Sequence, residues 1–148
     1  MSIEYIIGDI TKETTGLIVH QVNCQRVMGS GVALAIKNKW PIVYAKYLQS
    51  KQRLGDVQFV EVGYDLYVCN LFGQRYFGND GKKYTNLHAI ARGLYECFEY
   101  CDDEGLELKM PKIGCLRGGA DWETEILPII ETWMEEFPNV VVKVIDLV

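Results

Sequence analysis

Apolar and polar residues follow one another along the chain in blocks that predict strands and helices in alternation. Short apolar runs typical of buried strands occupy residues 3–7, 17–22, 57–62, 66–71, 106–110 and 140–148. Apolar residues recur at helical spacing over residues 32–40, 41–53, 86–103 and 122–137. Pro41 separates the first two helices, and residues 63–65 join two strands as a hairpin. This order predicts an α/β fold.

Length, charge and cysteine content narrow the class of protein. A chain of 148 residues suits a single domain over residues 1–148, and no apolar run is long enough to cross a bilayer. The net charge of −5 argues against tight, sequence-independent binding to nucleic acid, which can still enter as a modified substrate. Five cysteines without paired spacing or matching histidines predict reduced thiols and no metal site. We therefore expect a soluble cytoplasmic monomer.

A glycine loop after the second predicted strand is the first candidate site. Gly29 and Gly31 precede a helix that begins near Val32, so unpaired N–H groups and the positive end of the helix dipole would face any ligand over this loop. A phosphate or diphosphate suits that position. The same pattern also occurs in proteins that bind no phosphate, and the spacing is not that of a dinucleotide-binding fingerprint.

A second glycine loop, over residues 111–121, again joins a strand to a helix. Two such loops in one small α/β domain predict a cleft at the carboxyl ends of neighbouring strands. Two loops can hold an extended ligand at two points, which suits a diphosphate flanked by riboses. Between them, residues 72–83 form an aromatic, basic loop, in which Tyr76 and Phe77 either stack on a base or ribose or cover the end of the core.

Three polar residues have a structural and a functional interpretation each. Asp9, at a strand end, either caps the following turn or accepts a hydrogen bond from a ligand amine such as adenine N6. His20, inside a buried strand, is either a core residue or a catalytic group delivered to the pocket rim beside Asn23. Asp121 either caps the helix that starts at Trp122 or belongs to the site.

The motifs of both loops together resemble the macro domain family, the ADP-ribose-binding modules with a three-layer α/β/α fold and a central mixed sheet. The resemblance covers the whole chain and rests on residues 8–10, 22–24, 28–33, 111–115 and 118–122. Within the family, the chain is most similar to stand-alone ADP-ribose 1″-phosphate phosphatases. The resemblance implies hydrolysis of that terminal phosphate. The alternatives are a non-catalytic reader of ADP-ribose and a hydrolase of another ADP-ribose linkage.

The resemblance also implies residue roles. Asp9 and Ile10 would bind adenine, Asn23 would hold the distal ribose, and the two loops would enclose the diphosphate and terminal ribose. His20, Asn23 and Asp121 would be catalytic, with no metal or cofactor. The implied ligand-binding residues are Gly8, Asp9, Ile10, Val22, Asn23, Met28, Gly29, Ser30, Gly31, Val32, Ile113, Gly114, Cys115, Leu116, Arg117, Gly118 and Gly119.

Two positions depart from the family pattern. Leu116 stands where the phosphatase branch has glycine, which predicts a different path for the second loop and exposes Arg117 to a ligand phosphate. Relatives that remove ADP-ribose from acidic side chains or DNA carry a lysine after the central strand, where this chain has Gln74. Glutamine forms no Schiff base and is no nucleophile, so the resemblance implies chemistry without a lysine.

Overall fold

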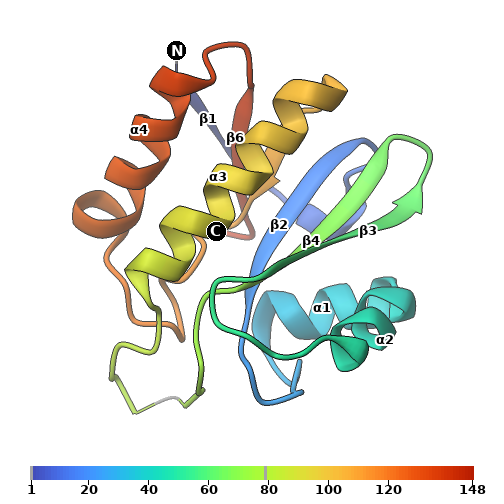
Figure 1. Ribbon diagram of the computed structural model, residues 1–148, viewed down its shortest axis with the longest axis vertical. Helices are drawn as coiled ribbons and strands as arrows, with labels where there is room; N and C mark the ends of the chain where they lie inside the picture. The colour runs from blue at the N-terminus through green and yellow to red at the C-terminus, as the bar shows by residue number, and fades with distance from the viewer. Residues whose placement is uncertain (1, 79) are drawn as a thin grey trace.

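The computed structural model describes residues 2–78 and 80–148, which form a central sheet with helices on both faces (Figure 1). The strands are β1 (Ile3–Ile7), β2 (Gly16–Val22), β3 (Val57–Gly63), β4 (Leu66–Phe72), β5 (Leu108–Met110) and β6 (Val142–Asp146). The helices are α1 (Gly31–Lys39), α2 (Pro41–Gln49), α3 (Leu87–Glu104) and α4 (Leu127–Glu136). A 3-10 turn follows β1 at Ile10–Lys12, and a π-helical turn at Trp122–Ile126 precedes α4.

The sheet is mixed, with strand order β1-β6-β5-β2-β4-β3. All neighbouring strands run parallel except the β3–β4 hairpin, which is antiparallel. Parallel strands place their carboxyl ends at one edge of the sheet, so the loops that follow β1, β2, β4 and β5 gather there. The predicted three-layer fold with a mixed sheet is confirmed.

Side chains of β2 alternate between two apolar cores. Leu17 and Val19 pack with α3 and α4 on one face of the sheet, whereas Ile18 and Val22 pack with α1 and α2 on the other. A strand covered on both faces explains the nearly continuous apolar run in its sequence. The same alternation sends His20 toward the α1–α2 side and Gln21 toward the α3 side.

Several element boundaries differ from the predicted ones for local reasons. The second helix ends at Gln49 rather than Arg53, whereas α3 begins where expected, with Asn86 as a cap that accepts a hydrogen bond from the Ala89 amide at 3.0 Å. The last helix, predicted over residues 122–137, is divided into the π-helical turn and α4. Pro128 lies in the first turn of α4, where its missing N–H disrupts no helical hydrogen bond.

Candidate functional site

A cleft of about 1100 Å³ opens at the carboxyl ends of the parallel strands. Its walls come from the loops that follow β1, β2, β4 and β5 and from the end of β6. The cleft contains most of the residues that the sequence predicts for the site: Gly8, Asp9, Ile10, His20, Val22, Asn23, Met28, Gly29, Ser30, Gly31, Val32, Ile113, Gly114, Cys115, Leu116, Arg117 and Gly118. Segments far apart in sequence therefore meet as predicted.

The first glycine loop presents the start of α1 to the cleft. Ser30 is the N-cap residue, but its side chain makes no capping hydrogen bond. Its carbonyl accepts from the Leu34 amide at 3.2 Å, which leaves the first-turn amides after Ser30 without a side-chain acceptor from the cap. The positive end of the α1 dipole thus faces the cleft at a point where an anion would be stabilised.

The turn that follows β2 is rigid because the Asn23 side chain holds it together. The Asn23 amide nitrogen donates to Val27 O at 2.9 Å, and its oxygen accepts from the Gln25 amide and the Tyr47 hydroxyl at 2.9 and 2.8 Å. Burial raises the pKa of Tyr47 to about 12, so the phenol keeps its proton and donates. Asn23 retains one N–H for a ligand.

The second glycine loop is held from outside by the segment before α3. The Tyr84 and Thr85 amides donate to Gly118 O at 2.8 and 3.0 Å, and the Thr85 hydroxyl donates to Gly114 O at 2.8 Å. A Cβ at Gly118 would lie 2.1 Å from the Thr85 hydroxyl oxygen, so this close approach requires glycine. Leu116, 91% exposed, and Arg117 project from this loop at the cleft rim.

A hydrogen-bonded network joins Gln21 and Gln74, which line the cleft, to Thr85, which lies outside the lining, and so ties the loops together. The Gln21 amide nitrogen donates to Gln74 Oε1 and to the Thr85 hydroxyl oxygen. The Gln74 amide nitrogen donates to Tyr76 O at 2.6 Å, and Thr85 donates to Gly114 O. The hydrogen bonds end on the carbonyl oxygens of Tyr76 and Gly114, which can only accept. The direction of every donor in the network is therefore fixed.

Asp9 performs the predicted cap and also lines the cleft. Its Oδ1 accepts from the Thr11 amide at 2.9 Å and from the Thr11 hydroxyl at 2.7 Å. These hydrogen bonds lower the pKa of the carboxyl, so Asp9 is ionised near neutral pH. The second carboxylate oxygen is not used by the cap, which leaves it for a ligand donor.

His20 lines the cleft but is almost fully buried, and its imidazole is hydrogen-bonded to Asn70. Only 1% of it is exposed, and its Nε2 lies 2.6 Å from Asn70 Oδ1. Burial lowers its pKa to about 4, which the hydrogen bond with Asn70 opposes only in part. The Asn70 amide donates to Val43 O and Gln58 Oε1, so its oxygen faces the imidazole, which must donate from Nε2. The core interpretation of His20 therefore fits the geometry better than the catalytic one.

Asp121 and Gly119 do not line the cleft. Asp121 caps the π-helical turn, because its Oδ2 accepts from the Thr124 amide at 2.9 Å and from the Thr124 hydroxyl at 2.7 Å. These bonds lower its pKa. Gly119 lies against the backbone of Lys82, where an added Cβ would be 2.7 Å from the Lys82 carbonyl oxygen. Of the two interpretations of Asp121, the structure supports the cap.

The fold and the loops agree with comparisons to a protein-family model, to curated proteins and to solved structures. The macro domain family model matches residues 19–126. The chain belongs to the macro domain family. It is 32% identical to a crystal structure from Bacteroides thetaiotaomicron, with a TM-score of 0.86 over 99% of this chain and 100% of that one. A macrodomain protein from Streptomyces coelicolor is 26% identical, with a TM-score of 0.77 over 98% of this chain and 99% of that one.

A curated relative of this macro domain is a DNA ADP-ribosyl glycohydrolase of Mycobacterium tuberculosis. The two are 29% identical over 131 residues, which are 82% of this chain and 36% of the relative. This macro domain therefore spans about a third of the length of that protein.

The macro domain cleft also contains residues that the sequence analysis did not assign to the site. They include Gln21, Gln74, Gly78, Lys112 and Asp146. The sequence did hold a signal for Gln21, because it is a polar residue in an otherwise largely apolar buried strand. No local signal pointed to the network, because its members come from segments up to 64 positions apart.

Tyr76 and Phe77 do not cover the core, since they are 61% and 52% exposed. Phe77 borders the cleft. This exposure contradicts the core-covering interpretation, and Tyr76 lies outside the cleft lining. The other aromatic loop residue, Tyr84, donates from its hydroxyl to Asp80 at 2.9 Å.

Three further properties of the macro domain bear on its chemistry: possible metal ligands, the length of its helices and the state of its thiols. In residues 2–78 and 80–148, no group of three His, Cys, Asp or Glu side chains is placed to share a metal ion, and no helix is long and apolar enough to span a membrane. All five cysteines are free. Burial raises the pKa of Cys115 to about 11, so this cleft thiol stays protonated near neutral pH.

Proposed function

We propose that this macro domain binds ADP-ribose in an extended form, with adenine at Asp9 and the terminal ribose at Asn23. Asp9 follows β1, and Asn23 follows β2, three strand positions away across the sheet. At the usual strand spacing this separation is about 14 Å, which suits a ligand with two nucleoside-like ends joined by a diphosphate. The unused carboxylate oxygen of Asp9 would accept from the adenine amine.

The observation that carries this proposal is the pair of loops that face one cleft. The uncapped start of α1 offers backbone N–H groups to an anion, and the glycine loop after β5 lies across the same cleft with Arg117 at its rim. A diphosphate between the loops would receive hydrogen bonds from backbone amides and a charge-assisted contact from Arg117.

We further propose hydrolysis at the terminal ribose, with ADP-ribose 1″-phosphate as the first substrate to test. Asn23 and the two loops would hold the terminal phosphate, and amide N–H groups would stabilise the charge that grows on its oxygens as water attacks phosphorus. The bond between phosphorus and the C1″ oxygen breaks, and a proton of the water passes to that oxygen, so the products are ADP-ribose and inorganic phosphate. His20 is buried with its Nε2 on Asn70, and Asp121 is a cap outside the cleft lining, so the proposed step relies on substrate positioning and electrostatic stabilisation.

A second candidate is removal of ADP-ribose from DNA. Its support is the 29% identity with the mycobacterial DNA ADP-ribosyl glycohydrolase. Gln74 occupies the position where the sequence analysis expects a lysine in such relatives, so this reaction would also proceed without a lysine. The two candidates share the ADP-ribose site and differ in the group attached to the terminal ribose.

Two product assays on one preparation separate the candidates. Inorganic phosphate released from ADP-ribose 1″-phosphate would support the phosphatase, and free ADP-ribose released from an ADP-ribosylated oligodeoxynucleotide would support the second reaction. Binding of ADP-ribose with neither product would make the chain a reader. The Asp9→Asn variant is the control, since either activity must fall with ADP-ribose affinity if both use the proposed cleft.

A further inference from the structure

We propose that Arg75, Tyr76 and Phe77, with Lys82 and Arg117, form a mouth surface that binds a single-stranded nucleic acid carrying the ADP-ribose. The proposal rests on the proposed function, because it takes the terminal ribose to lie beside Asn23. The mouth surface would recognise the strand next to the attachment point, and of its residues Arg117 would also contact the diphosphate of the ADP-ribose.

The mouth surface begins beside the expected position of the terminal ribose. Arg75 O accepts from the Cys24 amide at 3.1 Å and from the Gln25 side chain at 3.0 Å, so the loop starts against the Asn23 turn. Phe77 and Arg117 both line the cleft. A group attached to the terminal ribose would therefore leave the cleft across this surface, on the side away from Asp9.

Contacts on either side of the two exposed aromatic residues hold the backbone that carries them. Tyr76 O accepts from Gln74, and Gly78 packs so closely on Tyr84 that an added Cβ would lie 2.4 Å from the Tyr84 hydroxyl oxygen. Backbone contacts fix the loop on both sides of Tyr76 and Phe77, yet these rings remain 61% and 52% exposed. Exposed, positioned rings offer π-faces on which nucleobases can stack.

The charge of the mouth surface is opposite to that of the whole chain. Arg75, Lys82 and Arg117 are exposed, within a protein of net charge −5. Asp80 is an acidic neighbour, with its carboxylate 3.9 Å from the Lys82 ammonium, while Lys83 pairs with Glu125. Cations interleaved with exposed aromatic rings match a strand of phosphates and bases. An acidic peptide would match the cations but would leave the rings without a stacking partner.

The conjugated strand should bind better than either of its parts. The negative charge of the chain weakens its attraction for bare nucleic acid. Once ADP-ribose occupies the cleft, the attached strand meets the mouth surface at a high effective concentration, so a weak contact adds to affinity. The mouth surface would thus make the affinity depend on the molecule to which the ADP-ribose is attached.

The test compares three probes by fluorescence anisotropy and competition. They are free ADP-ribose, a ten-nucleotide single-stranded DNA with one ADP-ribose attached through C1″ to a central base, and a peptide with one ADP-ribose on a glutamate. We expect the DNA conjugate to bind about tenfold or more tightly than free ADP-ribose, from stacking of one or two bases. The peptide conjugate should match free ADP-ribose, and higher salt should reduce the gain for DNA.

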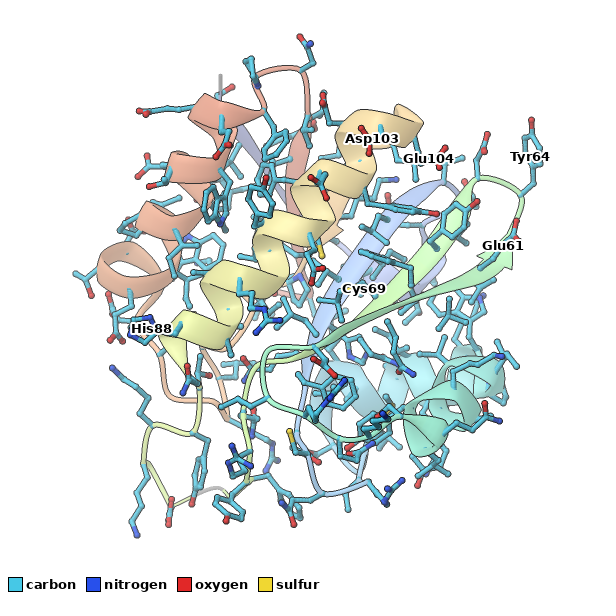
Figure 2. All side chains as sticks on the ribbon, viewed as in Figure 1. Glu61, Tyr64, Cys69, His88, Asp103 and Glu104 are labelled. Atoms are coloured by element: carbon cyan, nitrogen blue, oxygen red, sulfur yellow. The ribbon has the colours of Figure 1, made fainter. Side chains whose placement is uncertain are left out.

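Variants outside the cleft lining assign the gain to the mouth surface. Tyr76→Ala and Arg75→Ala should abolish it while leaving free ADP-ribose affinity unchanged, because both residues anchor the loop through carbonyl oxygens that alanine retains. Tyr76→Trp should keep it. Tyr64→Ala is the matched control: Tyr64 is 90% exposed in the β3–β4 turn, at the opposite end of β4 (Figure 2).

Two outcomes would overturn the proposal: an equal gain for the peptide conjugate, or a gain that survives in Tyr76→Ala. Failure of free ADP-ribose to bind would instead contradict the proposed function. In that case, binding of bare single-stranded DNA at low salt tests the mouth surface by itself. Binding that Tyr76→Ala removes and Tyr64→Ala retains supports the mouth surface, and its absence contradicts it.

Discussion

His20 illustrates how burial decides the role of a residue whose type alone is ambiguous. Its position in the strand was predictable from the apolar run, but its partner Asn70 lies fifty positions away and belongs to β4. The β2–β4 pairing brings the two into register. A pocket-rim histidine and a buried, hydrogen-bonded histidine have the same local sequence, and only the sheet distinguishes them.

The neutral state of His20 predicts a pH dependence of stability. Its pKa is about 4 in the folded protein and 6.5 in the unfolded chain, so the unfolded chain binds more protons between these values. The free energy of unfolding therefore falls as pH decreases from 6.5 toward 4. Between pH 7 and 5.5, where carboxylates stay ionised, the expected loss is about 1 kcal/mol.

Urea unfolding of wild type and His20→Gln at pH 7 and 5.5 measures this loss. The variant should be less stable at pH 7 but show a smaller pH dependence over the interval. If both proteins show the same dependence, His20 has the same pKa in the folded and unfolded chains and the assignment is wrong.

Two substitutions at Asp121 distinguish a capping role from a catalytic role. Asp121→Ala removes the acceptor for the Thr124 amide and should lower Tm, whereas Asp121→Asn retains an oxygen at the cap and should keep Tm near that of wild type. We expect neither variant to lose turnover on any ADP-ribose substrate beyond its loss of folded protein. Loss of turnover in Asp121→Asn at unchanged Tm would restore the catalytic role.

At the scale of elements, the periodicity of the sequence was sufficient for strands and most helices. Helix α3, with Asn86 as its cap, and the β3–β4 hairpin were predicted within one or two residues. The π-helical turn before α4 was not, because apolar spacing over residues 122–137 is that of one helix. Asp121 caps the start of this turn and Pro128 follows its end, and periodicity reveals neither.

The Gln21–Gln74–Thr85 network predicts that the second loop depends on a residue outside it. Thr85→Val removes the donor to Gly114 O and the acceptor for Gln21 at a buried site, and should lower the free energy of unfolding by about 1–3 kcal/mol. Because the loop after β5 then loses its support, affinity for ADP-ribose should fall, while affinity for AMP, which would use the Asp9 end, should not.

Thr85→Ser keeps the hydroxyl and is the control for this experiment. Calorimetry with ADP-ribose and AMP on wild type and both variants distinguishes support of the loop from general destabilisation. Equal loss of affinity for both ligands in Thr85→Val would show that the network has no specific effect on the second loop.

At the scale of the whole molecule, the sequence predicted the α/β fold and the convergence of two glycine loops because both follow from strand and helix order. Parallel strands must end at a common edge, so loops after β2 and β5 share a cleft whatever their side chains do. Strand order does not predict the exposed mouth surface or the Gln21–Gln74–Thr85 network. They depend on how residues 73–85 cross from β4 to α3, which apolar patterning does not describe.

The central claim is that the cleft binds ADP-ribose with adenine at Asp9, and calorimetric titration of ADP-ribose into wild type and Asp9→Asn tests it most directly. Asparagine keeps the oxygen that caps Thr11 but replaces the second carboxylate oxygen with an N–H donor facing the adenine amine. We expect one ADP-ribose per wild-type chain and an affinity about tenfold or more weaker in Asp9→Asn. No binding to wild type, or equal affinity in the two proteins, would contradict the claim.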